Sequence, residues 1–208
     1  MSGGRRIGVL GGTFDPVHVG HLVAAVNVRH ELRLDVVLLV VANEPWQKAG
    51  SREISPGPAR LAMVRAAVGD VPGVEASDLE IVRGGVSYTA DTLAQLRARE
   101  PSAELFLVVG ADVADGLEAW VRVEEVRSLA RLVVVNRPGA EVPAGPLRER
   151  GWDVSVVTIP ALEISSTDLR ARAADGRPLE FLVPEGAIRC IRELGLYAAR
   201  GRKGKHWA

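Results

Sequence analysis

Short runs of apolar residues recur along the chain, and most of them are rich in β-branched side chains. Strands that are covered on both faces show nearly continuous hydrophobicity instead of alternation, so these runs predict a parallel β-sheet. The predicted strands are Ile7 to Leu10, Val36 to Val41, Leu105 to Val109, Leu132 to Val135 and Val154 to Ile159.

Segments with a helical spacing of apolar residues lie between these runs, each about as long as a crossover helix needs to be. They are Gly20 to Leu32, Ala59 to Val68, Thr89 to Arg99 and Glu118 to Leu129, followed by two closing helices at Ser166 to Ala174 and Pro184 to Leu194. The alternation of strands and helices predicts an α/β fold with a doubly wound parallel sheet, which is Rossmann-like and binds ligands at the carboxyl ends of its strands.

The composition favours one cytosolic domain. The chain has 208 residues, 47% of them hydrophobic, so we expect a single domain over residues 1–198 and a frayed basic tail over residues 199–208. The 26 Lys and Arg residues balance 26 Asp and Glu residues, which leaves no basic field to attract nucleic acid or an anionic membrane. A single cysteine, Cys190, is typical of a cytoplasmic protein. We see neither a membrane-spanning run nor a signal peptide.

The first strand leads into a glycine-rich segment with two histidines, Gly11-Gly12-Thr13-Phe14-Asp15-Pro16-Val17-His18-Val19-Gly20-His21. Glycines at a strand-to-helix turn let the backbone approach a phosphate, and the helix N-terminus adds unpaired N–H groups. At a spacing of three residues, both imidazoles can face one ligand. The segment is neither a Walker A loop nor a Gly-x-Gly-x-x-Gly fingerprint. It therefore predicts an anion site of another kind.

Two other interpretations of this segment stay open at this point. The glycines can serve only the tight turn, with the histidines capping or packing the helix. Two histidines three residues apart can also ligate zinc, but no nearby acidic cluster completes such a site, so no protein metal ligand is predicted.

A second polar segment, Ile164-Ser165-Ser166-Thr167-Asp168-Leu169-Arg170, opens the first closing helix. Ser165 as N-cap with Asp168 three residues on resembles a capping box, and capping alone can account for the serine and threonine residues. It does not account for Arg170. One turn into the helix, this guanidinium can reach back to an anion and bind phosphate at two points.

Residues Gly11 to His21 resemble the signature of the nucleotidyltransferase superfamily whose His-x-Gly-His motif is shared with class I aminoacyl-tRNA synthetases. The flanking Gly-Gly-Thr-Phe-Asp-Pro narrows the resemblance to the small adenylyl- and cytidylyltransferases. It implies that the triphosphate and the transition state are held by His18 and His21, and that ATP is also bound by Gly11, Gly12, Thr13 and Phe14. The segment that contains Ser165, Ser166 and Arg170 is similar to the second signature of this family, which contacts the ATP phosphates.

Four further segments resemble the nicotinate mononucleotide adenylyltransferase branch. Ser87 to Leu93 matches a helix start whose threonine, here Thr89, contacts the nicotinate carboxylate, and Trp120 matches the residue that stacks on the pyridine ring. The other matches are Gly110-Ala111-Asp112, whose aspartate lies beside the ATP ribose, Asn136-Arg137-Pro138-Gly139, in which Arg137 is a substrate contact, and the ending Val183 to Tyr197. From the residues alone, Trp120 on a helix face can equally belong to the core, and Asp112 can be an N-cap.

The loop after the second strand departs from the pattern of this branch. The family has Pro-Pro-His followed by Lys or Arg, whereas this chain reads Asn43-Glu44-Pro45-Trp46-Gln47-Lys48. Asn43 is retained as a substrate-binding residue and Lys48 as a phosphate contact. No role is predicted for Gln47.

The resemblance implies transfer of the adenylyl group of ATP to nicotinate mononucleotide in NAD biosynthesis, with Mg²⁺ bound mainly through the ATP phosphates. The expected catalytic groups are His18, His21, Lys48 and Arg170, which bring positive charge to one point. Two alternatives remain: another transferase of the superfamily, such as a pantetheine-phosphate adenylyltransferase or a cytidylyltransferase, and a non-catalytic nucleotide sensor. Whether the chain forms a homo-oligomer is left open.

Overall fold

The computed structural model describes residues 4–45, 54–139, 142 and 144–198; the predicted tail lies outside them. Six parallel strands form one sheet in the order β4-β2-β1-β6-β7-β8. Their bounds are Arg6–Gly12 for β1, Val36–Val41 for β2, Val74–Ser77 for β4, Glu104–Gly110 for β6, Arg131–Asn136 for β7 and Val154–Thr158 for β8. The strand order runs outward in opposite directions from β1 and β6, so the point where ligands bind in doubly wound sheets lies between these two strands.

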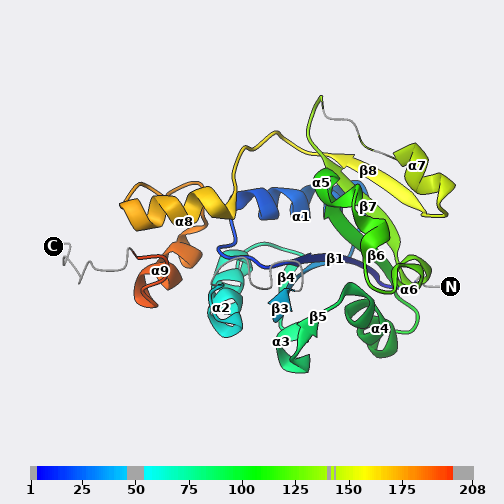
Figure 1. Ribbon diagram of the computed structural model, residues 1–208, viewed down its shortest axis with the longest axis horizontal. Coiled ribbons are helices and arrows are strands. Elements are labelled where there is room, and N and C mark those ends of the chain that lie inside the picture. The colour runs from blue at the N-terminus through cyan, green and yellow to red at the C-terminus, as the bar shows by residue number, and fades with distance from the viewer. Residues whose placement is uncertain (1–3, 46–53, 140–141, 143, 199–208) are drawn as a thin grey trace.

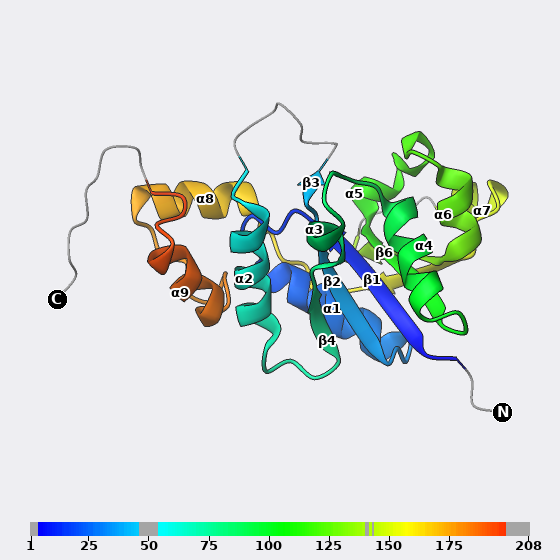
Figure 2. The same ribbon diagram turned by 90° about the horizontal axis from the view of Figure 1, so that it is seen from below.

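Helices pack on both faces of the sheet, with α1 on one side of the strands and α4 on the other (Figures 1 and 2). Alternate residues of β2 belong to different cores, because Val37 and Leu39 lie in one cluster and Val36 and Val40 in the other. The first cluster includes α1 (Val19–Glu31), α2 (Gly57–Val68), α8 (Ser166–Asp175) and α9 (Glu185–Glu193), and the second includes α4 (Thr89–Arg99), α6 (Val123–Leu129) and α7 (Ala144–Glu149). The predicted doubly wound α/β fold is confirmed.

All five predicted strands and five of the six predicted helices are confirmed to within two residues. The sixth strand of the sheet, β4, was not predicted because Val-Glu-Ala-Ser is not an apolar run; at an edge it has one neighbour and needs less burial. Five other short elements were also missed: the helices α3 (Leu79–Arg83), α5 (Ala111–Ala114) and α7, and the parallel pair of β3 (Glu44–Pro45) with β5 (Val86–Ser87).

The predicted helix from Glu118 to Leu129 is wrong in its first half. A 3₁₀ turn, η2 (Leu117–Ala119), ends at Trp120, whose backbone is extended, and α6 starts only after Arg122. Arg122 has a left-handed backbone with φ of 57° and pairs with Asp91 of α4. No glycine or proline marks this break, which is stabilised by a tertiary ion pair that sequence periodicity does not reveal.

No helix among the described residues is both long enough and apolar enough to cross a lipid bilayer.

Candidate active site

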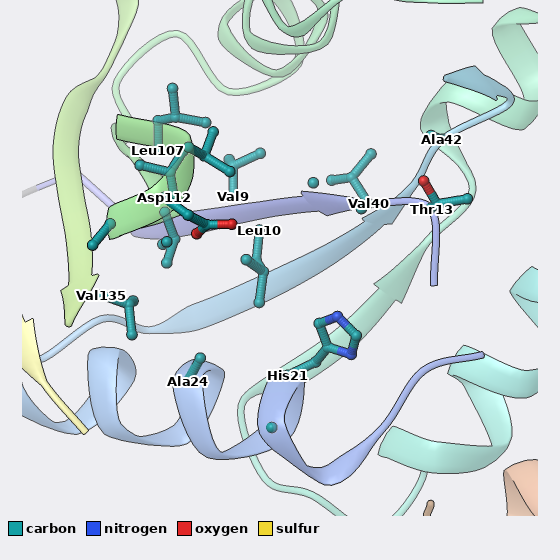
Figure 3. A pocket seen from close by; sticks show the side chains of 18 of the residues that line it. Val9, Leu10, Thr13, His21, Ala24, Val40, Ala42, Leu107, Asp112 and Val135 are labelled. Carbon is teal, nitrogen blue, oxygen red and sulfur yellow. The ribbon is translucent and has the colours of Figure 1, made fainter. Parts of the chain in front are cut away.

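A cavity of about 660 Å³ opens at the carboxyl ends of β1, β2, β6 and β7, where the strand order reverses. Ten of the residues predicted to bind ligands line it: Gly11, Gly12, Thr13, His18, His21, Thr89, Gly110, Asp112, Trp120 and Arg137. Its volume suits a nucleotide-sized ligand. Figure 3 shows His21 rising from α1 toward the strand ends and Asp112 pointing into the same space from α5.

The two histidines form a stacked pair at the N-terminus of α1. His18 is the N-cap residue and His21 lies in the first turn, with ring centroids 3.7 Å apart and an angle of 29° between the planes. The glycine between them leaves room for this contact, since a Cβ on Gly20 would lie tightly, 3.0 Å from His18 Nδ1. The spacing His-x-Gly-His therefore lets one imidazole lie close to the helix backbone while the other faces the cavity.

His21 is held in one orientation by the backbone and by a ring. Its Nδ1 accepts a hydrogen bond of 3.2 Å from the backbone N–H of His18, and Phe14 contacts it edge-on with centroids 4.9 Å apart. When Nδ1 is the acceptor, the proton of a neutral imidazole resides on Nε2. The local geometry thus makes His21 Nε2 a hydrogen-bond donor for a ligand.

Phe14 does not line the cavity, although sequence analysis places it among the ATP-binding residues. Its ring is buried, and it packs against His21 and against Gly12, where a Cβ would lie 2.7 Å from the phenyl ring. In this structure Phe14 therefore packs against the ring of His21 and does not itself face a ligand. The Gly-Gly-Thr-Phe pattern is explained in part by this packing.

Burial of the His18 side chain disfavours its charged form. Burial lowers the pKa of its imidazole from 6.5 to about 4, and within the described part of the chain its Nδ1 is buried without a hydrogen-bond partner. The imidazole therefore carries little positive charge at neutral pH unless an anion is bound. It can donate a hydrogen bond to phosphate, and it gains a proton only if a bound anion compensates the cost of burial.

This shift predicts how stability depends on pH. Between pH 6.5 and 4 the folded protein binds less than one proton at His18 while the unfolded chain binds nearly one, so the free energy of unfolding falls as pH falls. We expect His18→Asn, which removes the titrating group, to lose about 2 kcal/mol less than the wild type between pH 7 and pH 5. Urea unfolding of both proteins at the two pH values measures this difference. An equal loss would contradict the lowered pKa.

Three of the residues predicted to bind the mononucleotide, Thr89, Trp120 and Arg137, line the cavity. Thr89 is the first residue of α4, and Trp120 follows η2 at the break described above. Trp120 is half-buried and lines the cavity, whereas the buried core tryptophan is Trp152. The extended backbone at residue 120 thus places this indole on the cavity wall instead of on a helix face.

Sequence analysis missed a buried polar pair in the same wall. The Thr92 hydroxyl donates to Glu80 Oε1 at 2.5 Å, and both residues are buried and line the cavity. Thr92 lies one turn after Thr89 on α4, so the spacing places both hydroxyls on one helix face. The spacing of Thr89 and Thr92 is visible in the sequence, but it does not show that Glu80 of α3 accepts the hydrogen bond.

The segment from Ser165 to Arg170 packs against the loop after β1. Ser165 is confirmed as the N-cap of α8, accepting from the N–H of Asp168 at 3.2 Å, but the Asp168 carboxylate binds Arg172 at 2.6 Å and does not complete a capping box. Ser166 Oγ donates to the Pro16 carbonyl at 3.0 Å. The serines do not line the cavity of this structure.

Arg170 contacts the loop after β1. Its Nη1 donates to the Asp15 carbonyl at 2.8 Å and its Nη2 to Thr167 Oγ1 at 3.1 Å. The buried Asp15 carboxylate accepts from the Tyr197 hydroxyl at 2.6 Å. Burial and the adjacent carboxylate raise the pKa of the Tyr197 phenol, so it stays a donor. In this structure, Arg170 holds the loop after β1, residues 13–18, which is called the phosphate loop below. Arg170 does not line the cavity.

The loop after β2 is described only at its ends. Asn43 donates through its backbone N–H to Ser87 Oγ at 2.8 Å and through Nδ2 to the Gly85 carbonyl at 2.9 Å. Its side chain thus fastens the loop to the segment before Thr89. Lys48, Trp46 and Gln47 lie outside the described residues.

The described residues contain no cluster of three or more His, Cys, Asp or Glu side chains that could hold a metal ion. Asp112 is the carboxylate that Figure 3 shows pointing into the cavity. This donor set suits a cation that arrives bound to phosphates, because Mg²⁺ usually keeps most of its ligands from water and phosphate oxygens.

Comparison with known sequences identifies the family. A profile of the cytidylyltransferase-like family matches residues 9–172. A curated relative from Saccharopolyspora erythraea, named "Probable nicotinate-nucleotide adenylyltransferase", is 46% identical over 197 residues, which cover 95% of this chain and 92% of the relative. A relative of the same name from Streptomyces coelicolor is 45% identical and covers 90% of this chain and 98% of its own length.

Comparison with solved structures shows the same fold. The Plasmodium falciparum nicotinic acid mononucleotide adenylyltransferase complexed with NaAD has a TM-score of 0.77 and 16% sequence identity, and the match covers 93% of this chain and 97% of that one. Family membership rests on the curated relatives, whose identity extends over nearly the whole chain. This chain belongs to the nicotinate-nucleotide adenylyltransferase family of cytidylyltransferase-like proteins.

Proposed function

We propose that the protein transfers the adenylyl group of ATP to nicotinate mononucleotide, forming nicotinate adenine dinucleotide and pyrophosphate. The observation that carries the proposal is a single cavity whose lining includes the histidine pair together with Thr89 and Trp120. A nucleotidyltransferase needs such an arrangement, because it must hold two anionic substrates with their phosphates in contact. The names of the two curated relatives described above agree with it.

The reaction is an in-line displacement at phosphorus. A phosphate oxygen of the mononucleotide forms a bond to the α-phosphorus of ATP, while the bond from this phosphorus to the bridging oxygen of the β-phosphate breaks. Pyrophosphate leaves with that electron pair. Because the nucleophile is already an anion, the protein needs no general base, and it acts by positioning the substrates and stabilising developing charge.

In this proposal His21 is the central donor. Its Nε2–H is directed to the oxygens of the α-phosphate by the hydrogen bond at Nδ1 and by the rings of Phe14 and His18. A donor that is already oriented requires no reorganisation as charge develops. The N-terminus of α1 adds its unpaired N–H groups, and His18 adds a neutral donor that takes up a proton once the phosphates are bound.

The remaining assignments complete the site. Lys48 and Arg170 contact the ATP phosphates, Asp112 contacts the ribose, and Asn43 and Arg137 contact the mononucleotide. When bound through the ATP phosphates, Mg²⁺ neutralises part of their charge. We also propose that the reaction takes place in the cytosol, as the single cysteine favours.

A turnover assay tests the proposed function. The purified protein is incubated with ATP, Mg²⁺ and either nicotinate mononucleotide, phosphopantetheine or CTP with a phosphorylated alcohol, and pyrophosphate release is followed. We expect turnover with ATP and nicotinate mononucleotide. Turnover with only another pair would identify a different transferase of the superfamily, and ATP binding without turnover would identify a nucleotide sensor.

We expect Arg170→Lys to raise the Michaelis constant for ATP roughly fivefold, which corresponds to about 1 kcal/mol for one lost hydrogen bond. A single ammonium cannot serve phosphate at two points while keeping the Asp15 and Thr167 contacts. Initial rates at varied ATP measure the change. Arg172→Lys, which alters an arginine paired with Asp168, is the control on the same helix. An unchanged Michaelis constant for ATP would mean that Arg170 only holds the loop after β1 and does not contact ATP.

A further inference from the structure

Arg60 of α2 is one of the most deeply buried side chains of the protein, with 1% of its surface exposed. A buried guanidinium is costly unless its donors are satisfied. Here four hydrogen bonds run to backbone carbonyl oxygens: those of Ser55 at 2.7 Å, Thr13 at 2.8 Å, Ala42 at 2.6 Å and Asn43 at 3.0 Å. The planar fork of arginine is therefore used to join backbone segments.

These carbonyl groups belong to three separate parts of the chain. Thr13 lies in the phosphate loop after β1. Ala42 and Asn43 lie directly after β2, at the start of the connection to α2 (residues 42–56), which is called the substrate loop here. Ser55 lies at the other end of that loop, just before α2. Arg60 thus connects the phosphate loop with both ends of the substrate loop.

The connected residues form part of the cavity wall, but Arg60 does not. Thr13 and Ala42 both line the cavity, and Figure 3 shows them side by side at its edge. Arg60 holds their carbonyl groups from the side remote from the ligand. A displacement of this guanidinium would move the wall that faces the phosphates without removing any contact to a substrate.

We propose that Arg60 is a positioning residue that keeps the phosphate loop and the substrate loop in one fixed relation, so that both substrates bind with their phosphates aligned. The inference rests on the proposed function, because it assigns the two loops to the two substrates. It explains why an arginine occupies the buried face of α2, where Met63, Val64 and Ala67 are apolar. A hydrophobic residue would fill this position but would leave four carbonyl groups unpaired.

The test compares Arg60→Lys and Arg60→Met with Arg65→Lys and Arg65→Met. Arg65 lies on the same helix, is exposed and pairs with Asp78, so its variants control for changes of charge and helix propensity. Initial rates are measured at varied concentrations of each substrate, and the fraction of folded enzyme is measured by near-UV circular dichroism. We expect both Arg60 variants to lose about 10- to 100-fold in kcat/KM, with higher KM values for ATP and for nicotinate mononucleotide per folded enzyme.

A purely structural role gives a different result. The apparent kcat would then fall in proportion to the unfolded fraction while both KM values stayed unchanged, which would overturn the proposal. If Arg60→Met does not fold, Arg60→Lys decides the question, because lysine retains the charge but cannot reach four carbonyl groups at once. If the wild type shows no turnover, the proposed function fails separately, and calorimetric titration with ATP then tests Arg60: we expect about tenfold weaker binding, and equal affinity would refute the role.

Discussion

His21→Ala is expected to lower the turnover number by at least about a hundredfold, the scale on which the loss of one preorganised donor to a transition state is felt. The affinity for ATP should fall much less, because other groups also hold the triphosphate. The structure supplies the physical reason: the His18 N–H and the Phe14 ring orient this imidazole before any ligand binds. Steady-state kinetics with ATP and nicotinate mononucleotide measures both effects.

The control for this variant is His30→Ala, which removes an exposed histidine from the other end of α1. Circular dichroism spectra of both variants show whether the helix is retained. If His21→Ala folded normally and kept near-normal turnover, the transition-state role would be refuted, and the histidine pair would serve only to start α1.

The second large effect concerns the choice between the acid and the amide mononucleotide. A carboxylate only accepts hydrogen bonds, whereas the NH₂ of nicotinamide only donates them. If the Thr89 hydroxyl and the N–H of Val121 point to this group, the amide leaves one donor badly paired, at a cost of about 1 to 3 kcal/mol. We therefore expect a preference of roughly five- to 150-fold for the acid, and we expect Thr89→Ala to reduce it.

Trp120→Ala should behave differently. An indole that stacks on the cationic pyridine ring contributes on the order of 1 to 3 kcal/mol to either substrate and does not distinguish them. Values of kcat/KM for both mononucleotides should fall together while their ratio stays nearly constant. A wild type that prefers the amide, or a Trp120→Ala variant with an altered ratio and unaltered affinities, would overturn these assignments.

The sequence was sufficient to predict five of the six strands of the sheet and the location of the cavity. Strands such as Val36–Val41 are buried on both faces, so their hydrophobicity is continuous and independent of tertiary detail. The segment from Gly11 to His21 is local, and the carboxyl end of a parallel strand is where such a segment meets ligands.

The supporting residues could not be predicted because their partners are distant in the chain. Arg60 bonds to carbonyl groups that carry no side-chain signature; the available signal, which sequence analysis did not use, was a charged residue in register with Met63 and Val64 on α2. The break at Trp120 coincides with the pairing of Arg122 with Asp91, and the contact of Arg170 with the Asp15 carbonyl joins residues 155 positions apart.

The contacts of the loop after β1 also constrain how the protein is synthesised. Ser166 and Arg170 reach this loop across 150 and 155 residues of chain, and Tyr197 reaches Asp15 across 182. Strand β1 pairs with β2, which follows it closely in the sequence, but the loop after β1 gains these contacts only once the segment from Ser166 to Tyr197 has been synthesised. Because such distant contacts are slow to close, the loop after β1 acquires its final shape late in folding, after its local helix and strands have formed.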